Sequence, residues 1–449
     1  MSDPVPTPPG AAPAPTTPQL RFARAIVIAA LALALSFLGL LNAITSVPLI
    51  RDSLGPLVWE HKADSPAAIL VTLAVAVLVP IIALIICSRR GWLRWPQLVA
   101  LSAIVLATFV YLSWDEPTVR RPLTMDELSP PLPGDEATFQ VFLRYAKNSP
   151  AANAVKSPKT TTLVAESNFA TKPEPWAQFL REHRADVEAD WAALAPVRSW
   201  WDELAAQPRI GDLTPPRPDA PIIAFQAVRA YTQIAVAVAC LQALDGHGDE
   251  AMATVTRLYD VARKFEPNSR TLVRTMVGKV MQRMALQAGG FVLDHAAVSP
   301  ASRATFAAEI SAGALGAAGA RRLILIEYAF FQPMFSLFIG GTAIGGQEDQ
   351  RIFQQVVHYL GHLVVNPIAT QNFVGDRYYA LAALAAERRL GELEVNKGPI
   401  DRDSRGGYRV KNIGGRLFAD AAMPALSKVT KSYWDIEDLR VALLARLKS

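Results

Sequence analysis

The chain has 449 residues, of which 51% are hydrophobic, and its formal net charge at pH 7 is +5. Residues 1–114 carry seven Lys and Arg against four Asp and Glu, so the remainder has a surplus of only about two positive charges. Nucleic-acid binding requires a clustered basic surface, so we exclude DNA and RNA as principal partners. Only two cysteines are present, which excludes a disulfide framework.

Residues 1–20 contain seven prolines and almost no charge, which predicts a disordered Pro-rich tail. A membrane module is predicted over residues 21–114, because about 20 apolar residues suffice to cross ~30 Å of hydrocarbon. Its three spans are predicted at about 25–45, 66–87 and 97–114. The first run is longer than the ~7–15 residues of a signal-peptide core, so we favour an uncleaved span over a cleaved leader.

Aromatic and basic residues mark the ends of these spans. Amphipathic rings favour the headgroup region, and five aromatic residues lie at predicted boundaries: Trp59, Trp92, Trp95, Tyr111 and Trp114. Five arginines flank the spans on the N-terminal side, three of them in the loop 88–96, against four Lys and Arg on the other side. We therefore expect a bacterial inner (plasma) membrane protein whose N-terminus is cytoplasmic and whose large C-terminal domain is periplasmic or otherwise extracytoplasmic.

The chain after the third span is rich in proline and charge, which predicts a stalk and loop over residues 115–172 with a short helix at Glu136–Lys147. A helical domain is predicted over residues 173–449, with its first regular helix beginning at Pro175 and interrupted by Pro196. Four tryptophans follow helical spacing here, which favours a packed core over an aromatic ligand cage: Trp176, Trp191, Trp200 and Trp201.

Longer helices follow from residue 220. We predict one at Ala220–Leu244, a second capped by Asp249, a third capped by Asn268, and a fourth that Ser299 and Pro300 open as N-cap and first residue. Turns of two to five residues between such helices make neighbours antiparallel. The fold class is therefore predicted to be all-α, an α-helical hairpin bundle or a short α-solenoid.

The segment GHGDEAMATVTRLYDVARKFEP resembles the second half of a tetratricopeptide repeat, with Gly246 and Ala251 at its glycine and small-residue positions. No second copy follows at a period of 34 residues. The resemblance implies a TPR-like hairpin and does not establish a peptide-binding groove.

The run Arg322–Gly346 is almost long enough to cross a membrane, but it contains Glu327, Gln332 and Pro333. A carboxylate near the middle of a bilayer costs roughly 2.5–3.5 kcal/mol. We therefore predict a helix that is buried or lies on the membrane surface, rather than a fourth span.

One pair of side chains could bind a metal. His358 and His362 lie four residues apart, which puts both imidazoles on one helical face, as in zinc peptidases. Tyr359 stands where such enzymes have a catalytic glutamate, and two histidines on an apolar helix also occur as hydrogen-bonded packing residues. The spacing does not choose between three candidates for a third ligand: Asp376, Glu348 and Glu327. The chain lacks the common nucleophile and phosphate-loop motifs, so no catalytic residue or cofactor is predicted.

The C-terminal segment predicts an amphipathic helix from Asp435. Its apolar stripe consists of Ile436, Leu439, Leu443, Leu444 and Leu447, and its cations complement the helix dipole near the end: Arg440, Arg446 and Lys448. The chain from Lys397 onward carries eleven Lys and Arg against six Asp and Glu, which is compatible with contact to anionic headgroups or with an ordinary solvated face.

Three segments in order, FEPNSRTLVRTMVGKVMQRMALQ, LIEYAFFQPMF and NIGGRLFADAAMPALSKVTKSYWDIEDLRVALLARL, resemble an uncharacterised bacterial membrane-anchored α-helical protein family over residues ~220–449. The resemblance implies an architecture and no catalytic activity.

Three functions are compatible with these patterns. The first is a membrane-anchored helical scaffold or interaction protein of the bacterial cell envelope, with the lipid bilayer and another envelope protein as partners. The second is a metal-dependent hydrolase that uses His358 and His362. The third is a lipid- or small-molecule-handling module that contacts the membrane through Arg322–Gly346.

Overall fold

The computed structural model describes residues 114–148, 173–216, 220, 223, 225–339, 366–395 and 426–448, together with scattered positions between 17 and 111. The chain divides into two compact units. The first contains Met1–Thr118, Ile339–Thr370 and Tyr408–Ala422, and the second contains Val119–Phe338, Gln371–Gly407 and Met423–Ser449.

The three predicted spans, at about 25–45, 66–87 and 97–114, fall almost entirely outside the described residues, as does most of the tail 1–20. Among the helices that are described, none has both the length and the apolar character that crossing a membrane requires. The spans therefore stay predictions.

The described residues form thirteen helices and no strand, which confirms the all-α prediction for this part of the chain. The helices before residue 225 are α5 (Met125–Leu128), α6 (Asp135–Asn148), α9 (Pro173–Glu182), α10 (Arg184–Ala193) and α11 (Ala195–Ala206). The later ones are α12 (Gln226–Leu244), α13 (Gly248–Lys264), α14 (Leu272–His295), α15 (Pro300–Ala312), α16 (Gly316–Ile339), α18 (Pro367–Ala386), α19 (Leu390–Val395) and α22 (Leu426–Lys448).

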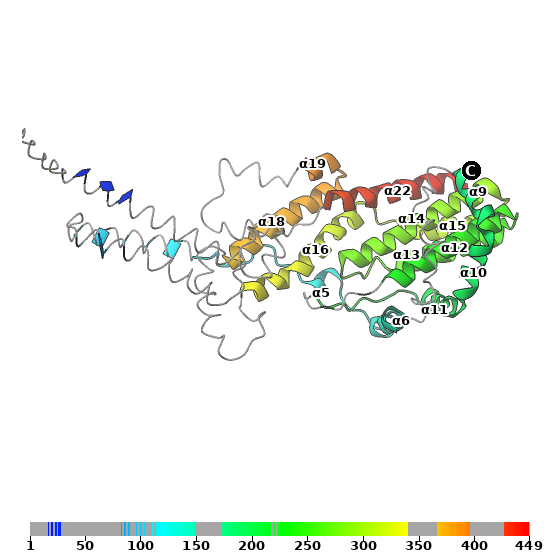
Figure 1. The fold of residues 1–449 in the computed structure, drawn as a ribbon, viewed down its shortest axis with the longest axis horizontal. Helices are drawn as coiled ribbons and strands as arrows, with labels where there is room; N and C mark the ends of the chain where they lie inside the picture. Colours follow the sequence, from blue (N-terminus) through cyan, green and yellow to red (C-terminus); the bar gives the residue numbers. More distant parts are fainter. Residues whose placement is uncertain are drawn as a thin grey trace, which may run out of the picture. The chain divides into compact units, whose positions relative to one another are not determined.

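Three consecutive helices, α12, α13 and α14, form the centre of the bundle and pack on one another. Gly246 makes the tight turn between α12 and α13 at a φ of +85°, a conformation that favours glycine. Helix α22 packs along α14 and α15 although it is the last helix in the sequence, as Figure 1 shows. The C-terminus of the chain is therefore part of the bundle.

One hydrophobic core joins α6 and α9–α15 to α22. Trp176, Trp200 and Trp201 are fully buried in it, and Trp201 stacks on Tyr231 with ring centroids 4.3 Å apart. Trp191 is partly buried against the same core. The tryptophans are thus packing residues, and a ligand cage is not formed.

Two predicted helix caps were wrong. Thr271, not Asn268, caps α14 by accepting a hydrogen bond from the backbone N–H of Arg274. Asp249 lies in the first turn of α13, where its carboxylate accepts the backbone N–H of Ser299, the N-cap of the neighbouring α15, at 2.8 Å. The cap that Ser299 and Pro300 predict for α15 is confirmed.

Helix limits differ from the sequence pattern in three further places. The expected helix from Pro175 is divided at His183 and Leu194 into α9, α10 and α11, and α12 begins at Gln226 instead of Ala220. Helix α22 begins nine residues before Asp435, and Arg440, which was expected to complement the helix dipole near the end, is buried in the middle of the helix. Tertiary packing sets these limits.

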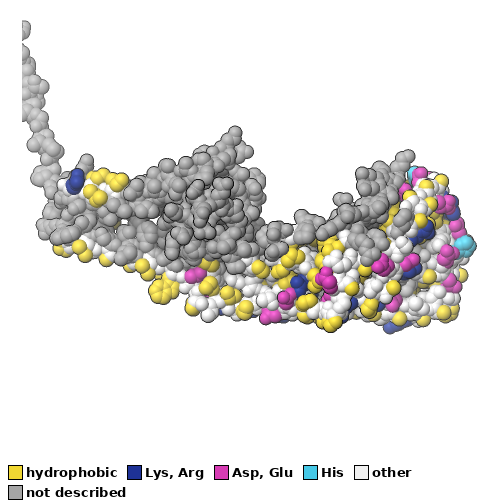
Figure 2. All heavy atoms as spheres, turned by 90° about the horizontal axis from the view of Figure 1, so that it is seen from below, with side chains coloured by type: hydrophobic (Ala, Val, Ile, Leu, Met, Phe, Trp, Pro, Cys, Tyr) yellow, Lys and Arg dark blue, Asp and Glu magenta, His cyan; other side chains and the backbone are white. Residues whose placement is uncertain are grey.

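One face of the bundle mixes both signs of charge. On the face in Figure 2, Lys and Arg are interspersed with Asp and Glu among apolar side chains. A mixed surface of this kind is typical of an ordinary solvated face.

Candidate functional site

The predicted metal ligands are not brought together within the described residues. His358, His362 and Glu348 lie outside those residues, so the pair stays a prediction. Asp376 on α18 is ion-paired with Arg120 and Arg121 at 2.7 Å each, which commits its carboxylate elsewhere. Across the described part of the chain, no group of three His, Cys, Asp or Glu side chains could hold a metal ion.

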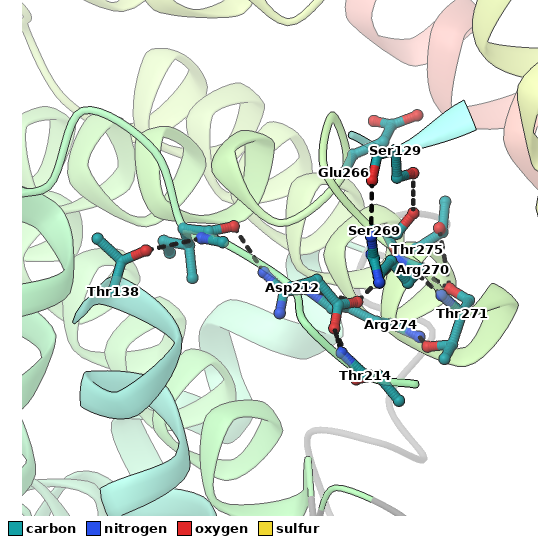
Figure 3. Close-up of polar contacts among 12 residues, drawn as sticks. Ser129, Thr138, Asp212, Thr214, Glu266, Ser269, Arg270, Thr271, Arg274 and Thr275 are labelled. Carbon is teal, nitrogen blue, oxygen red and sulfur yellow. Dashed lines mark hydrogen bonds and ion pairs between the residues drawn. The ribbon is translucent and has the colours of Figure 1, made fainter. Parts of the chain in front are cut away.

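The structure instead gathers charged side chains inside the bundle. One group surrounds Asp212 near the N-terminus of α14 (Figure 3). The Asp212 carboxylate accepts hydrogen bonds from the backbone N–H of Arg270 at 2.8 Å and from the backbone N–H and hydroxyl of Thr214 at 3.0 and 2.6 Å. The Nε of Arg274 lies 3.7 Å from the same carboxylate, and both side chains are completely buried.

Arg274 reaches this group between two aromatic rings. Its guanidinium lies 5.4 Å from the ring centroid of Phe142 and 5.2 Å from that of Phe265, and its Nη2 donates to the carbonyl of Ile210 at 2.8 Å. Burial lowers the pKa of Arg274, and Asp212 opposes that shift. The ring faces stabilise the cation, and Asp212 supplies its counter-charge at 3.7 Å. Among the described residues, the Nε and Nη1 of Arg274 have no hydrogen-bond acceptor.

A second group, which we call the lysine cluster, consists of Glu266, Lys279, Gln282, Glu437 and Arg440. Lys279 Nζ lies 2.9 Å from a Glu266 carboxylate oxygen and 3.4 Å from one of Glu437. Arg440 Nε donates to Glu437 at 3.0 Å, and the Gln282 amide donates to Glu266 at 3.3 Å. Two cations and two carboxylates thus balance in the interior, where an unpaired charge would be costly.

Arg322 on α16 connects the two groups. Its guanidinium donates to the carbonyls of Glu266 and Ser269 at 3.0 Å each and to the hydroxyl of Ser129 at 2.5 Å. Burial lowers the pKa of Arg322, and Glu266 and Asp212 oppose this. The turn between α13 and α14 is therefore bonded on one side to α16.

A third feature is the segment Val119–Ser129, which we call the strap. The backbone N–H of Arg120 donates to Asn372 at 2.6 Å, and the Tyr328 hydroxyl donates to the carbonyl of Arg121 at 2.8 Å. The backbone N–H of Leu123 donates to the side-chain oxygen of Gln332 at 2.9 Å. The first half of the strap is therefore held by both α16 and α18.

The second half of the strap continues into the bundle. It contains α5, whose buried Met125 packs on Ile326 and Ala329 of α16. Asp126 is ion-paired with Arg270, and the Ser129 hydroxyl donates to the carbonyl of Ser269 at 2.9 Å. The strap thus ends on the turn between α13 and α14, beside Asp212.

Glu327, which we considered as a metal ligand, lies on α16 close to Tyr378 of α18. Burial raises the pKa of Glu327 to about 7, and burial followed by the charge of Glu327 raises that of Tyr378. The neighbouring α16 residues Leu323, Ile324 and Ile326 are buried by the protein. The first half of Arg322–Gly346 is therefore a buried helix, one of the two alternatives expected for it.

Sequence reasoning missed the lysine cluster and the strap. A signal for the cluster was present, because Lys279, Glu437 and Arg440 occupy positions on the apolar faces of their helices. Charged residues at such positions are seldom buried unless paired. Their partners could not be named, because they lie on other helices.

No protein-family model, curated protein or solved structure matches the chain.

Proposed function

We propose that the chain is a membrane-anchored helical scaffold of the bacterial cell envelope, with its helical bundle on the extracytoplasmic side and another envelope protein as its partner. The observation that carries this proposal is the strap. Residues directly after the third predicted span belong to the hydrogen-bond network of α16 and α18 instead of forming a free linker.

The strap shortens the part of the chain that could act as a free linker after the third predicted span. Arg120, Arg121 and Leu123 bond to two separate helices, α16 and α18. Ordering a flexible linker on binding costs entropy. A strap that is already bonded to the bundle avoids that cost, which supports a scaffold role.

The way in which the buried charged side chains are bonded supports the same function. The charged side chains around Asp212 and Lys279 are bonded to one another and to backbone carbonyls, so they stabilise the bundle. A catalytic group would need access to a substrate. The helical hairpins α12–α13 and α13–α14 suit a TPR-like, short-solenoid scaffold, in which the stacked hairpins present an extended concave binding surface.

The experiment is photo-crosslinking of the full chain in native membranes. A photoreactive residue replaces Val273 on α14 or Val441 on α22, which are 59% and 57% exposed. We expect a protein adduct of discrete mass from at least one of these positions. The same residue at Val292, which is fully buried, is the control and should give none.

A second part of the same crosslinking experiment tests the strap. Asp376→Ala releases Arg120 and Arg121 and should lower the adduct yield without lowering the amount of protein in the membrane. The matched change Asp438→Ala breaks an exposed ion pair with Arg388 and should leave the yield unchanged. If neither exposed position gives a protein adduct, or if both Asp variants act alike, the scaffold proposal fails.

A further inference from the structure

Three arginine side chains gather around the turn between α13 and α14. Arg322 and Arg270 both donate to Ser129, the first to its hydroxyl at 2.5 Å and the second to its carbonyl at 3.1 Å. Arg274 joins them at Asp212 (Figure 3). The Asp212 oxygen that accepts the backbone N–H of Arg270 at 2.8 Å lies 3.7 Å from Nε of Arg274.

The cations of this region exceed their counter-charges by one. Four of them each have a carboxylate within 4 Å, in the pairs Arg270–Asp126, Arg274–Asp212, Lys279–Glu266 and Arg440–Glu437. Arg322 has no such carboxylate among the residues that the structure describes, because its three acceptors are two carbonyls and a hydroxyl. A guanidinium does not lose its proton in proteins. The surplus charge is therefore permanent.

Longer-range charges do not remove this surplus. Glu266 and Asp212 are the carboxylates that act on Arg322 from a distance. Each of them is already paired with a closer cation, Lys279 and Arg274 respectively. A largely buried cation without a counter-charge of its own is costly, so this position favours an anion.

Two of the guanidiniums also have N–H groups that are available to an acceptor. Across the described part of the chain, neither Nε nor Nη1 of Arg274 has a hydrogen-bond partner, and the same holds for Nε of Arg270. The Arg274 side chain is completely buried, and Arg270 is 7% exposed. Buried donors are nearly always paired in native proteins, because leaving one unpaired costs free energy.

The start of α14 adds further positive potential at the same place. Arg270 lies just before the N-cap Thr271, and Arg274 lies in the first turn of this 24-residue helix. The aligned peptide dipoles of a helix amount to roughly half a positive charge at its N-terminus. Anions bind at such ends when other donors are present, and here the two arginines supply them.

We propose that Arg270, Arg274 and Arg322, at the start of α14, bind one small monovalent anion of the size of chloride. A single negative charge matches the surplus of one cation, and the guanidinium N–H groups provide charge-assisted hydrogen bonds. The size is limited because the Arg274 guanidinium is completely buried between two phenylalanine rings. A phosphate group is larger and carries more negative charge than this region can balance.

The test measures the melting temperature of the full chain in a non-ionic detergent while chloride replaces gluconate at constant ionic strength. Gluconate carries the same charge but is too large for an enclosed site. A ligand that binds only the native state stabilises it with the logarithm of its concentration. We expect a rise of about 3 °C for each tenfold increase in chloride above the dissociation constant, and a similar rise with bromide.

Arg322→Met removes the surplus cation and should abolish this rise. Arg257→Met breaks an exposed ion pair with Asp202 and is the matched control, which should keep the rise. A wild-type melting temperature that is the same in chloride and gluconate overturns the proposal. An equal response to chloride in wild type and in Arg322→Met also overturns it, because the effect would then be unspecific.

A change at Asp126 tests the site even if Arg322→Met does not fold. The Asp126 side chain is 71% exposed and is the counter-charge of Arg270. Asp126→Asn should therefore leave a second cation unbalanced and lower the chloride concentration for half-maximal stabilisation about tenfold. Asp438→Asn, at the exposed pair with Arg388, should leave that concentration unchanged. The same value in both variants rejects the anion site.

Direct binding gives a readout that does not depend on stability. Exchange of chloride with a protein site broadens its NMR signal, so wild-type protein should broaden the signal and an excess of bromide should reverse the effect. Absence of broadening that bromide reverses counts against the site. The photo-adducts from Val273 and Val441 are measured independently, so failure of this inference leaves the scaffold proposal standing, and the reverse is also true.

Discussion

At the scale of single residues, most of the polar interior serves packing. Lys279 is completely buried and lies between Glu266, in the turn after α13, and Glu437 of α22. Arg274 similarly joins Asp212 to the ring faces of Phe142 and Phe265. A buried charge is stabilised mainly by its partners. Replacing one of these residues therefore lowers stability mainly because its partner remains buried without a counter-charge.

Lys279→Met should lower the free energy of unfolding by about 3–5 kcal/mol, because it leaves two carboxylates facing each other in the interior. Urea unfolding of the detergent-solubilised chain, followed by the fluorescence of the buried tryptophans, measures the change. Arg388→Met, which breaks the exposed pair with Asp438, is the matched control and should have a much smaller effect. Equal effects of the two changes would show that the lysine cluster is not sealed from water.

Glu327 predicts a dependence of stability on pH. Burial raises its pKa from an ordinary value of 4.5 to about 7, so the native state holds the proton more tightly than the unfolded state does. The associated stabilisation is fully present below about pH 4.5 and is lost as the pH rises through about 7.

Glu327→Gln removes the titration while keeping a neutral side chain of similar size. The melting temperature of the variant should exceed that of wild type at pH 8 and match it more closely at pH 5. Val273→Thr, at an exposed position of α14 without a titratable group, should give the same difference at both pH values. A Glu327 variant without any pH-dependent difference would mean that the carboxyl is well solvated.

At the scale of elements, several helices depend on groups outside themselves. The carboxylate of Asp115 accepts the backbone N–H groups of Ile368 and Ala369, at 2.8 and 2.9 Å, and so caps the start of α18 from a distant part of the sequence. Asp249 of α13 supports the start of α15 in the same way through Ser299. Such contacts explain why Asp249, which was predicted to cap its own helix, instead bonds to the start of another helix.

Asp115→Ala should cost about 0.5–2 kcal/mol, the usual range for loss of a helix cap, and should speed hydrogen exchange of the first-turn amides of α18. Asp115→Asn keeps one side-chain oxygen as acceptor and should have the smaller effect. Exchange rates that are unchanged in both variants would show that α18 does not depend on this carboxylate.

At the scale of the whole molecule, the proposed location of the bundle is open to a direct test. A C-terminal epitope tag follows Ser449, after α22. If the large domain is extracytoplasmic, protease added to intact spheroplasts should remove the tag while a cytoplasmic marker stays intact. Protection of the tag until the spheroplasts are lysed would place the bundle in the cytoplasm and reject an envelope scaffold.

The sequence by itself determined the helical class and several local signals, because these depend on residues close together in the chain. Periodic apolar residues indicate the long helices, and Ser299 with Pro300 marks the start of α15. The pattern also placed Ile436, Leu443 and Leu447 on the buried stripe of α22. Each of these inferences needs only a few neighbouring residues.

Only the tertiary structure decided the sites. Lys279 and Glu437 are 158 positions apart, and Arg121 and Asp376 are 255 apart, so no local pattern connects them. Arg440 shows the difference at one residue: its sequence position predicted a cation that complements the helix dipole near the end, whereas the fold buries it and pairs it with Glu437. Which charged residues become partners depends on which helices pack together. That packing depends on the whole chain and not on any short stretch of sequence.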